Sequence, residues 1–555
     1  MRRPVSPTWL LVLQCCKWIQ RGGSSDPPRS KRRFGLRAAG QEIRRAGSRV
    51  FVLVITLPLA LALGAAAATA APASPDADAL AADLDRILAE GGLGKTVTAV
   101  RVLDLGEPGG AARAKTLLRR EADRPLIPAS NMKLVTTAAC FDRFGPDWRI
   151  RTHVGRFPSG RGKGKWDLAV IGGGDPNLSG RFWNGDTVGA FRRWARILKA
   201  RGLTAVERIV LDDTLFDTRL VHPNWPANQR DKWYEAPVSA LTINDNCVNV
   251  RVAAGGAAGD PARVRLEPPG GGVRLSGGIR TVADRKAHRY SLDRFVDPDG
   301  TLRIRAAGGF WLKAPERVEY RTLADPARVF GQALAWTLRQ EGIAVAGPVV
   351  RGVLTQSSGE AVEGFRCDLI HTSRLAMTAA VANARSQGVY AECLLKLLGA
   401  YGQTPAVETP HPPRQGSWQS GRQELAGWLA ERGIPAAGCV FDDGSGLSKE
   451  NRATAFVLTE VLALMHRRTG AGFRNTLAVA GRTGSLAKRM GDTAAEGRIF
   501  AKTGYVAGAS TLSGYAATAS GRLLAFSILM NGFPYGQLWK ARLVQDKMCI
   551  RMTGY

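Results

Sequence analysis

Residues 126–144 read LIPASNMKLVTTAACFDRF, a turn followed by an amphipathic helical pattern. Pro128 suits the start of that helix, and Ser130 with Lys133 then forms an S-x-x-K whose side chains lie on one face, one turn apart. A serine hydroxyl is a poor nucleophile until a base removes its proton, and a lysine whose pKa is lowered by burial and positive neighbours can be that base. At the positive end of the helix, the Ser130 N–H can also donate to an oxyanion. The stretch therefore predicts a helix that presents a nucleophile beside its base.

An S-x-x-K on its own is weak evidence, because the chain holds a second copy at 485–488. An ordinary helix N-cap would explain Ser130 without any catalysis. For Ser485, which follows Gly484, a turn residue is the favoured interpretation. The assignment of Ser130 therefore depends on the other motifs of the chain.

A second candidate is Ser386, in a polar turn between the helical patterns at 375–384 and 390–398. A hydroxyl held there could pass a proton to a leaving group. On spacing alone, a helix-ending turn with Gly388 as its stop is the stronger explanation. A rival loop at 443–451, DGSGLSKEN, offers the Ser448 hydroxyl and the Asn451 amide, although a solvated glycine-rich turn explains it as well.

The third candidate is Lys502-Thr503-Gly504, at the end of a strand-like run and before another apolar segment. Lys502 would present a cation to a carboxylate and Thr503 a hydroxyl, while Gly504 would let a substrate backbone approach an edge strand closely. The alternative is a strand end with a solvated lysine. Near copies at 468–470 and 482–484, both RTG, show how easily the tripeptide arises, but neither copy ends an alternating strand pattern.

Around these motifs, the pattern divides the chain into α/β outer parts and a β-rich middle. Helices are predicted at 77–90, 375–384, 390–398, 423–430, 453–467 and 536–549, and strands at 96–105, 498–502, 511–518 and 523–530. From about 150 to about 365 the chain shows short strand-like runs broken by Gly and Pro. We therefore expect a catalytic domain formed by 75–155 and 366–555, interrupted by one or more inserted β-rich domains at 156–365.

Residues 1–72 have the features of a leader with an export signal. Arg44, Arg45 and Arg49 precede an apolar run at 50–63, and small residues with A-x-A-like cleavage sites follow. The apolar run is short for a membrane span and contains Pro58, which argues against an uncleaved anchor. We expect an exported protein, either periplasmic or extracellular.

The composition excludes several classes of protein. Of 555 residues, 45% are apolar, so disorder is not the main state, and 77 Lys and Arg against 47 Asp and Glu give a net charge of +30. Such a basic chain could contact an anionic wall or membrane peripherally, whereas the lack of any nucleic-acid-binding motif argues against nucleic acid. The six histidines show no ligand spacing and no G-x-S-x-G occurs, so we expect no metal, no cofactor and no α/β-hydrolase. Six cysteines beyond the leader form no C-x-x-C, and either separate core residues or disulfides would fit them.

In combination, the S-x-x-K, the serine turn and the K-T-G, in this order after an export signal, resemble the residue set of penicillin-binding proteins and serine β-lactamases. The interval of about 250 residues between Lys133 and Ser386 is similar to that of the low-molecular-mass class C penicillin-binding proteins, the D-alanyl-D-alanine carboxypeptidase/endopeptidase family, which carries inserted domains there. Stretches at 172–176, 236–246, 390–392, 443–448 and 480–486 also resemble that family. The resemblance covers about 80–555.

One position departs from the family pattern. The family's second motif is S-x-N; Ser386 matches its serine, but Gly388 stands in the place of the asparagine. A glycine has no side-chain amide to hold the acyl-amide group of a substrate, which puts the efficiency of acylation in doubt but not the nucleophile. The loop around Ser448 resembles a separate family signature, which implies a structural loop near the site.

The resemblance implies an α/β (α+β) fold, namely a β-lactamase/transpeptidase-like domain with an antiparallel sheet flanked by helices and interrupted by β-rich inserted domains. It implies a serine-type D-Ala-D-Ala carboxypeptidase or endopeptidase that acts on peptidoglycan stem peptides, with penicillin and other β-lactams as covalent inhibitors. Ser130 would attack the substrate after Lys133 takes its proton. Ser386, with or without Lys133, would pass a proton to the departing amine.

The same resemblance assigns the substrate-binding residues. Lys502 and Thr503 of the K-T-G would bind the terminal carboxylate, with Gly504 beside them. The backbone N–H groups of Ser130 and Tyr505 would hold the oxyanion. Two alternatives stay open: a catalytically silent cell-wall-binding or assembly protein on this fold, and a β-lactamase or D-amino-acid esterase.

Overall fold

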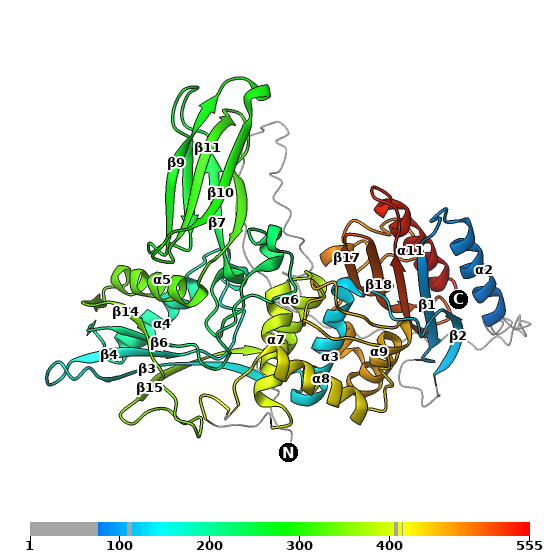
Figure 1. Ribbon diagram of the computed structural model, residues 1–555, viewed down its shortest axis with the longest axis horizontal. Helices are drawn as coiled ribbons and strands as arrows, with labels where there is room; N and C mark the ends of the chain where they lie inside the picture. The colour runs from blue at the N-terminus through cyan, green and yellow to red at the C-terminus, as the bar shows by residue number, and fades with distance from the viewer. Residues whose placement is uncertain (1–75, 108–113, 405–408, 413) are drawn as a thin grey trace, which may run out of the picture.

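The computed structural model describes residues 76–107, 114–404, 409–412 and 414–555, so the leader predicted at 1–72 lies outside the described residues. Figure 1 shows a sheet flanked by helices at one end of the long axis, a helical middle, and a β-rich part with a tall projection at the other end. Among the described helices, none combines the length and the apolar character needed to cross a membrane.

A six-stranded antiparallel sheet lies at the centre of the first region, in the order β16-β17-β18-β19-β1-β2. Two of its strands come from the start of the described chain and four from the end: β1 (Val97–Asp104), β2 (Lys115–Arg120), β16 (Ala478–Val479), β17 (Ile499–Val506), β18 (Ala509–Ala517) and β19 (Leu523–Asn531). β1 pairs with β19 along its whole length, from Val97 opposite Asn531 to Asp104 opposite Leu524. This pairing closes the two outer segments of the chain into one unit.

Helices cover both faces of this sheet. On one face lie α2 (Ala77–Glu90) and α11 (Leu538–Thr553), and on the other lies α9 (Ala455–Thr469), with the short α10 (Ala471–Arg474) beside it. Behind α9 the helical middle contains α3 (Met132–Phe144), α6 (Leu375–Ala384), α7 (Gly388–Tyr401) and α8 (Trp418–Glu431). Every residue of α7 is buried, which explains its almost wholly apolar sequence, GVYAECLLKLLGAY.

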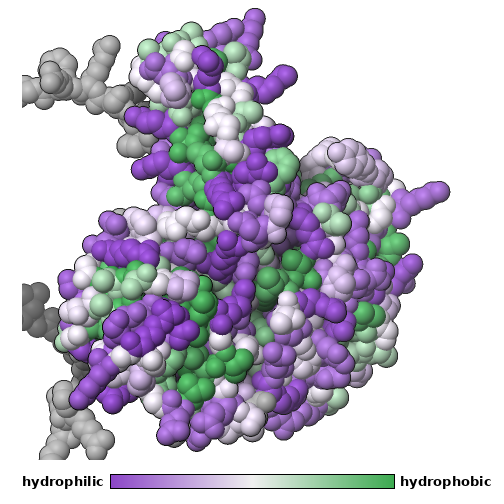
Figure 2. Space-filling view, turned by 60° about the vertical axis from the view of Figure 1, so that its left-hand side comes forward, coloured by the Kyte–Doolittle hydropathy of each residue, from purple (hydrophilic) through white to green (hydrophobic). Residues whose placement is uncertain are grey.

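The β-rich part contains a five-stranded sheet in the order β14-β6-β4-β3-β15 and two three-stranded sheets, β10-β11-β9 and β12-β7-β8. The first sheet consists of β3 (Arg149–Pro158), β4 (Trp166–Ile171), β6 (Ile209–Asp212), β14 (Val349–Arg351) and β15 (Arg366–Arg374), with the pair β5 (Ala205–Val206) and β13 (Ala344–Val345) apart from it. The other two consist of β7 (Cys247–Ala253), β8 (Arg263–Glu267), β9 (Val273–Val282), β10 (Arg289–Val296), β11 (Leu302–Trp311) and β12 (Arg317–Thr322). Figure 2 shows the projection rising from the body, with hydrophobic residues along it between hydrophilic ones.

The sequence pattern missed two helices in this β-rich part, α4 (Gly189–Ala200) and α5 (Pro326–Gln340). α4 buries Phe191, Trp194 and Leu198, which recur at helical spacing, but four basic residues on its outer face obscure that period. α5 begins with the Asp325 side chain as N-cap, followed by proline at its first turn. The aspartate and the proline are both visible in the sequence as signals of a helix start.

The strands of the five-stranded sheet indicate where the inserted part begins and ends. β3 starts at Arg149 and β15 ends at Arg374, and the two strands pair with each other in the five-stranded sheet. We therefore propose that the inserted part runs from β3 to β15, slightly wider at each end than 156–365, and the division into domains stays a prediction. The six cysteines of the described chain are all free thiols, four of them buried.

Candidate active site

Ser130 lies in the 3₁₀ turn that opens α3, and Lys133 follows one turn later. Lys133 Nζ donates to Ser130 Oγ at 3.1 Å and to the carbonyl oxygen of Ser445 at 2.7 Å. Only 2% of Lys133 is exposed, and this burial lowers its pKa to about 8, against the opposing effect of the Glu392 and Asp443 carboxylates. The serine hydroxyl thus lies within reach of an amine that can lose its proton near neutral pH.

Two residues of this region hold a left-handed backbone although neither is a glycine. Ala129 has φ 45° and Ser386 has φ 61°. Such conformations cost on the order of 1–3 kcal/mol each and persist only where the surrounding structure enforces them, as at functional sites. Ala129 directly precedes Ser130, and Ser386 is itself a predicted site residue. The backbone strain therefore lies next to the two hydroxyl groups of the predicted site.

Ser386 lies in the turn between α6 and α7, as the sequence pattern predicted, and Lys502 reaches it from β17. Lys502 Nζ donates to Ser386 Oγ at 2.8 Å and to the carbonyl oxygen of Thr503 at 2.6 Å. Lys502 is fully buried, and this burial, together with the charge of Lys133, lowers its pKa well below the usual value. The structure thus places a second serine–lysine pair beside the first.

The K-T-G lies inside β17 rather than at the end of a strand, because the strand continues to Val506. On its outer side, β17 pairs within the described chain only through Phe500 and Ala501 to the short β16, which leaves the following residues facing the pocket. A Cβ at Gly504 would lie 2.1 Å from Thr511 Oγ1 and 3.0 Å from the Ser130 nitrogen. The packing of β17 against the start of α3 therefore requires glycine at position 504. The close approach of a substrate to this residue stays a prediction.

Side chains tie β17 and the helix start together. Asn131 Nδ2 donates to the carbonyl oxygen of Lys502 at 2.9 Å. Thr503 Oγ1 donates at 2.8 Å to Ser485 Oγ, so the second S-x-x-K lies against the third motif and not against the first. Tyr505, whose N–H was assigned to the oxyanion, has a half-exposed side chain at the rim.

A pocket of about 680 Å³ brings the predicted residues together. Its lining includes Ser130, Lys133, Ser386, Thr503, Gly504 and Tyr505, and Lys502 lies buried beneath it. A wider groove of about 800 Å³ next to β10 and β12 contains none of these groups, so the chemistry and not the size identifies the site. Among the described residues, no group of three or more His, Cys, Asp or Glu side chains is arranged to hold a metal ion.

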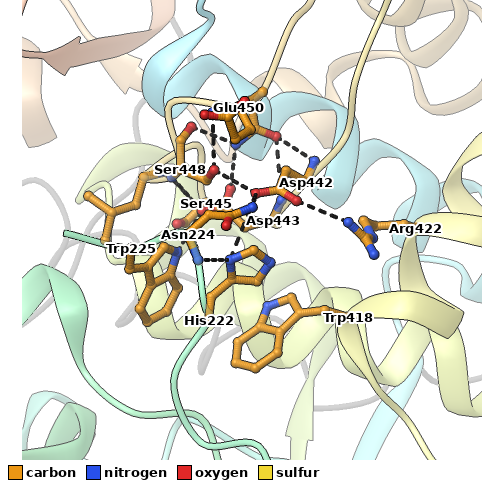
Figure 3. A network of polar contacts seen from close by, with 12 residues as sticks. His222, Asn224, Trp225, Trp418, Arg422, Asp442, Asp443, Ser445, Ser448 and Glu450 are labelled. Carbon is orange, nitrogen blue, oxygen red and sulfur yellow. Dashed lines mark hydrogen bonds and ion pairs between the residues drawn. The ribbon is translucent and has the colours of Figure 1, made fainter. Parts of the chain in front are cut away.

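The loop 442–451 is held against the site by Asp443. Figure 3 shows its carboxylate at the centre of a polar network, in which Trp225 Nε1 donates to it at 2.8 Å and the Ser448 N–H at 2.8 Å. Ser448 and Asn451, the alternative site candidates, make hydrogen bonds within this loop. Ser448 Oγ donates to Asp442 at 2.6 Å and Asn451 Nδ2 donates to Asp443 at 2.9 Å. The geometry therefore agrees with a structural role for Ser448.

A second buried carboxylate, Glu392 of α7, holds the same loop from the other side. It accepts from the N–H groups of Gly444 at 2.9 Å and Ser445 at 2.7 Å, and from Trp418 Nε1 at 2.8 Å. Burial and the neighbouring Asp443 raise the pKa of Glu392 to about 7. The sequence pattern did not assign Glu392 to the site, although an acidic residue inside an almost wholly apolar helix was a usable signal.

Gly388 opens α7 at one wall of the pocket. A Cβ there would lie 3.0 Å from the carbonyl oxygen of Tyr234 and 3.7 Å from Ser445 Cβ. A side chain at this position would require the Tyr234 segment to shift. The β-rich part thus packs closely against the position from which the asparagine side chain of an S-x-N would extend.

Asp245 connects the β-rich part to the second motif. Its carboxylate accepts from Gln387 Nε2 at 2.9 Å, from the Tyr390 hydroxyl at 3.1 Å and from Arg181 Nε at 2.8 Å. Asp245 belongs to the stretch 236–246 that resembled the family. Its contacts fix the residues on either side of Gly388.

Two arginines at the outer end of the pocket were not predicted. Arg489 pairs with Asp546 at 2.7 Å, whereas Arg542 of α11 makes no ion pair within the part of the chain that the structure describes. Burial and the adjacent Arg489 lower the pKa of Arg542. An unpaired guanidinium in the same pocket as Thr503 is suited to a carboxylate.

Glu235, next to Tyr234, makes folding stability depend on pH. Its side chain is buried, neither carboxylate oxygen has a hydrogen-bond partner among the described residues, and Arg230 Nε lies 4.0 Å from Oε2. Burial raises the pKa of Glu235 to about 7, against the opposing charge of Arg230. The folded chain therefore keeps a proton that the unfolded chain releases above about pH 4.5, so stability falls as the pH rises toward 7. We expect Glu235→Gln to stabilise the protein at pH 8 by on the order of 2 kcal/mol, and not at pH 4.

Denaturant unfolding of wild type and Glu235→Gln at the two pH values measures this difference. The exposed Glu363, changed to Gln, is the matched control and leaves the pH dependence unaltered. A variant less stable than wild type at pH 8 would mean that the ion pair of Glu235 with Arg230 outweighs the cost of burying the carboxylate.

Comparison with known proteins gives consistent matches over this whole region. The model of a protein family described as D-Ala-D-Ala carboxypeptidase 3 (S13) matches residues 80–550. A D-alanyl-D-alanine carboxypeptidase of Actinomadura sp. (strain R39) is 33% identical over 493 residues, which cover 86% of this chain and 85% of that protein.

Solved structures show the same fold. The crystal structure of penicillin-binding protein 4 (dacB) from Haemophilus influenzae matches with a TM-score of 0.66 at 20% identity, over 84% of this chain and 97% of that one. A structure of the same protein in complex with a β-lactam matches with a TM-score of 0.62 at 21% identity. The arrangement of a sheet, flanking helices and a β-rich insertion is thus one that known proteins share.

Proposed function

The chain belongs to the D-Ala-D-Ala carboxypeptidase 3 (S13) family, and from this premise we propose that it is a penicillin-sensitive serine peptidase acting on peptidoglycan stem peptides that end in D-Ala-D-Ala. The Actinomadura relative is named for this activity, and the Haemophilus protein has been solved with a β-lactam bound. The observation that carries the proposal is the Ser130–Lys133 contact of 3.1 Å, with burial lowering the pKa of the lysine to about 8. A nucleophile and a base at this distance can form an acyl-enzyme.

Acylation begins when Lys133 takes the proton of Ser130 and the serine oxygen attacks the carbonyl of the penultimate D-Ala. The carbonyl π pair moves onto oxygen, and we assign the N–H groups of Ser130 and Tyr505 to stabilise the negative charge there. The helix dipole at the start of α3 adds to that stabilisation.

The tetrahedral intermediate then collapses. The C–N bond breaks and the departing amine takes a proton through the Ser386 hydroxyl, which Lys502 holds by a hydrogen bond of 2.8 Å. Lys502 lies buried beneath the pocket, so it reaches a terminal carboxylate through Thr503, and a bound carboxylate would favour the protonated form of the lysine. Water hydrolyses the acyl-enzyme, whereas the acyl group left by penicillin remains bound.

The test is to incubate the purified protein with a fluorescent penicillin and with a peptide ending in D-Ala-D-Ala, following intact mass and D-Ala release. We expect one long-lived adduct on Ser130 and release of D-Ala that penicillin abolishes. A folded protein with no adduct would contradict the proposal and indicate a silent wall-binding homologue, an outcome that Gly388 would explain. Rapid adduct turnover would indicate a β-lactamase or esterase.

The place of action follows from the substrate. Because peptidoglycan lies outside the cytoplasm, the protein acts there, and the predicted leader would deliver it to the periplasm or the extracellular space. Peripheral contact with an anionic wall or membrane is supported by the net charge of about +20 that remains after the leader and by Trp539 and Leu543, which are 61% and 46% exposed on α11.

A further inference from the structure

Lys133 Nζ has one hydrogen-bond partner fewer than its ammonium form has donors. A protonated lysine carries three N–H donors. Among the described residues, Lys133 Nζ has two partners, Ser130 Oγ at 3.1 Å and the Ser445 carbonyl oxygen at 2.7 Å. Once Lys133 has taken the proton of Ser130, a third donor needs an acceptor in a buried site, where an unmet donor is costly.

An acceptor without a partner lies in the same place. Ser445 is 2% exposed, and its hydroxyl makes no hydrogen bond to any residue that the structure describes. The backbone of Ser445 is fixed on both sides, since its N–H donates to Glu392 at 2.7 Å and its carbonyl accepts from Lys133. Rotation about its Cα–Cβ bond can therefore give the hydroxyl a new partner without any movement of the backbone.

The location of the Ser445 hydroxyl, next to Gly388, also supports a role in the site. Ser445 Oγ lies 3.9 Å from the position that a Cβ on Gly388 would take, and thus borders the space left by the missing asparagine. Tyr234 crowds a side chain at 388 itself, because its carbonyl oxygen lies 3.0 Å from that position. A polar group for this corner must therefore come from another residue, and Ser445 carries one.

We propose that Ser445 is a positioning residue for the reaction, whose hydroxyl rotates to accept the third N–H of Lys133 once Lys133 is protonated. The inference deepens the proposed function and rests on it. As the Ser130 Oγ–carbon bond forms, the proton moves from Oγ to the lone pair of Lys133, and the carbonyl π pair moves to oxygen. When the C–N bond breaks and Lys133 returns that proton through Ser386 to the departing nitrogen, the Ser445 hydroxyl is released.

This role predicts a shift in the pH dependence of acylation. The charged groups that face Lys133 are Glu392 from α7 and Asp443 from the loop, which favour its protonated form, and Lys502 from β17, whose pKa it depresses in turn. Loss of the Ser445 hydroxyl costs the protonated form more than the neutral form, because a hydrogen bond from a charged donor is the stronger one. The pKa of Lys133 then falls further, and the acid limb of the acylation profile moves to lower pH.

The experiment compares penicillin acylation rates of wild type and Ser445→Ala from pH 6 to 10. We expect the maximal rate to fall roughly tenfold to a hundredfold and the acid limb to move down by about one pH unit, the effect of one hydrogen bond to a charged group. Ser445→Thr, which keeps a hydroxyl, retains most of the rate. Ser276→Ala is the matched control, because Ser276 in β9 also has an unpartnered buried hydroxyl and lies outside the pocket.

A second measurement separates this inference from the proposed function. In a Ser130→Ala background, which cannot be acylated, the pKa of Lys133 is read from ¹³Cε-labelled lysine by NMR, the resonance being assigned by its loss in Lys133→Met. A lower lysine pKa on adding Ser445→Ala supports the inference even if wild type turns over no peptide. The inference would be overturned if Ser445→Ala changed neither the pKa of Lys133 nor the pH of the acid limb, whatever happened to the acylation rate.

Discussion

Ser130→Ala gives a folded protein that forms no covalent adduct with penicillin and releases no D-Ala, a fall of roughly 10⁴-fold or more in acylation. The Ser130 hydroxyl is the acceptor of the Lys133 Nζ hydrogen bond at 3.1 Å, at the end of a helix whose dipole favours the oxyanion. No other serine meets both conditions among the described residues of the pocket, since Ser386 is bonded by Lys502 in a turn. Intact mass after incubation with penicillin measures the loss.

The second S-x-x-K provides the control. Ser485→Ala removes the other copy of the motif and takes from Thr503 the acceptor of its 2.8 Å hydrogen bond. We expect it to keep the adduct on Ser130 and to slow acylation by no more than about tenfold, the value of one neutral hydrogen bond. An adduct that survives in Ser130→Ala and disappears in Ser485→Ala would reverse the assignment of the nucleophile.

The family, the fold class and the peptidase function were predicted from the sequence, and the comparisons confirm them. They could be predicted because acyl transfer by this chemistry needs particular residue types at short spacing, which a linear sequence displays directly. Ser130 and Lys133 are three residues apart, and the K-T-G residues are consecutive. The roles of these residues stay predictions, although the structure brings them around one pocket.

The sequence pattern did not reveal the contacts that link distant segments. Ser445 and Glu392 reach Lys133 from other parts of the chain, and Tyr234 reaches Gly388 from the β-rich part. No spacing rule connects such residues, because their proximity is created by tertiary packing. The departure of Gly388 from S-x-N is visible in the sequence, but the carbonyl oxygen that lies 3.0 Å from its Cβ position is visible only in three dimensions.

Lys133→Met leaves a folded protein in which acylation by penicillin falls by roughly 10²–10⁴-fold, the usual contribution of a general base. Methionine has a similar length and fills the space without a polar head group, so the change removes the base with little loss of packing. Because the pKa of Lys133 is about 8, wild type gains rate as the pH rises through that value. Lys133→Met lacks this rise, and its residual acylation rate does not change with pH in that range.

A matched control distinguishes a lost base from a lost buried charge. Lys396 of α7 is also fully buried, but it pairs with Asp217 at 2.6 Å and lies outside the pocket, so Lys396→Met lowers stability and leaves the acylation rate near that of wild type. The base also serves the water of deacylation, so the slow adduct of Lys133→Met is longer-lived than that of wild type. If Lys133→Met kept the wild-type rate and its pH limb, the base would have to be sought at Lys502, the other buried lysine, which donates to Ser386.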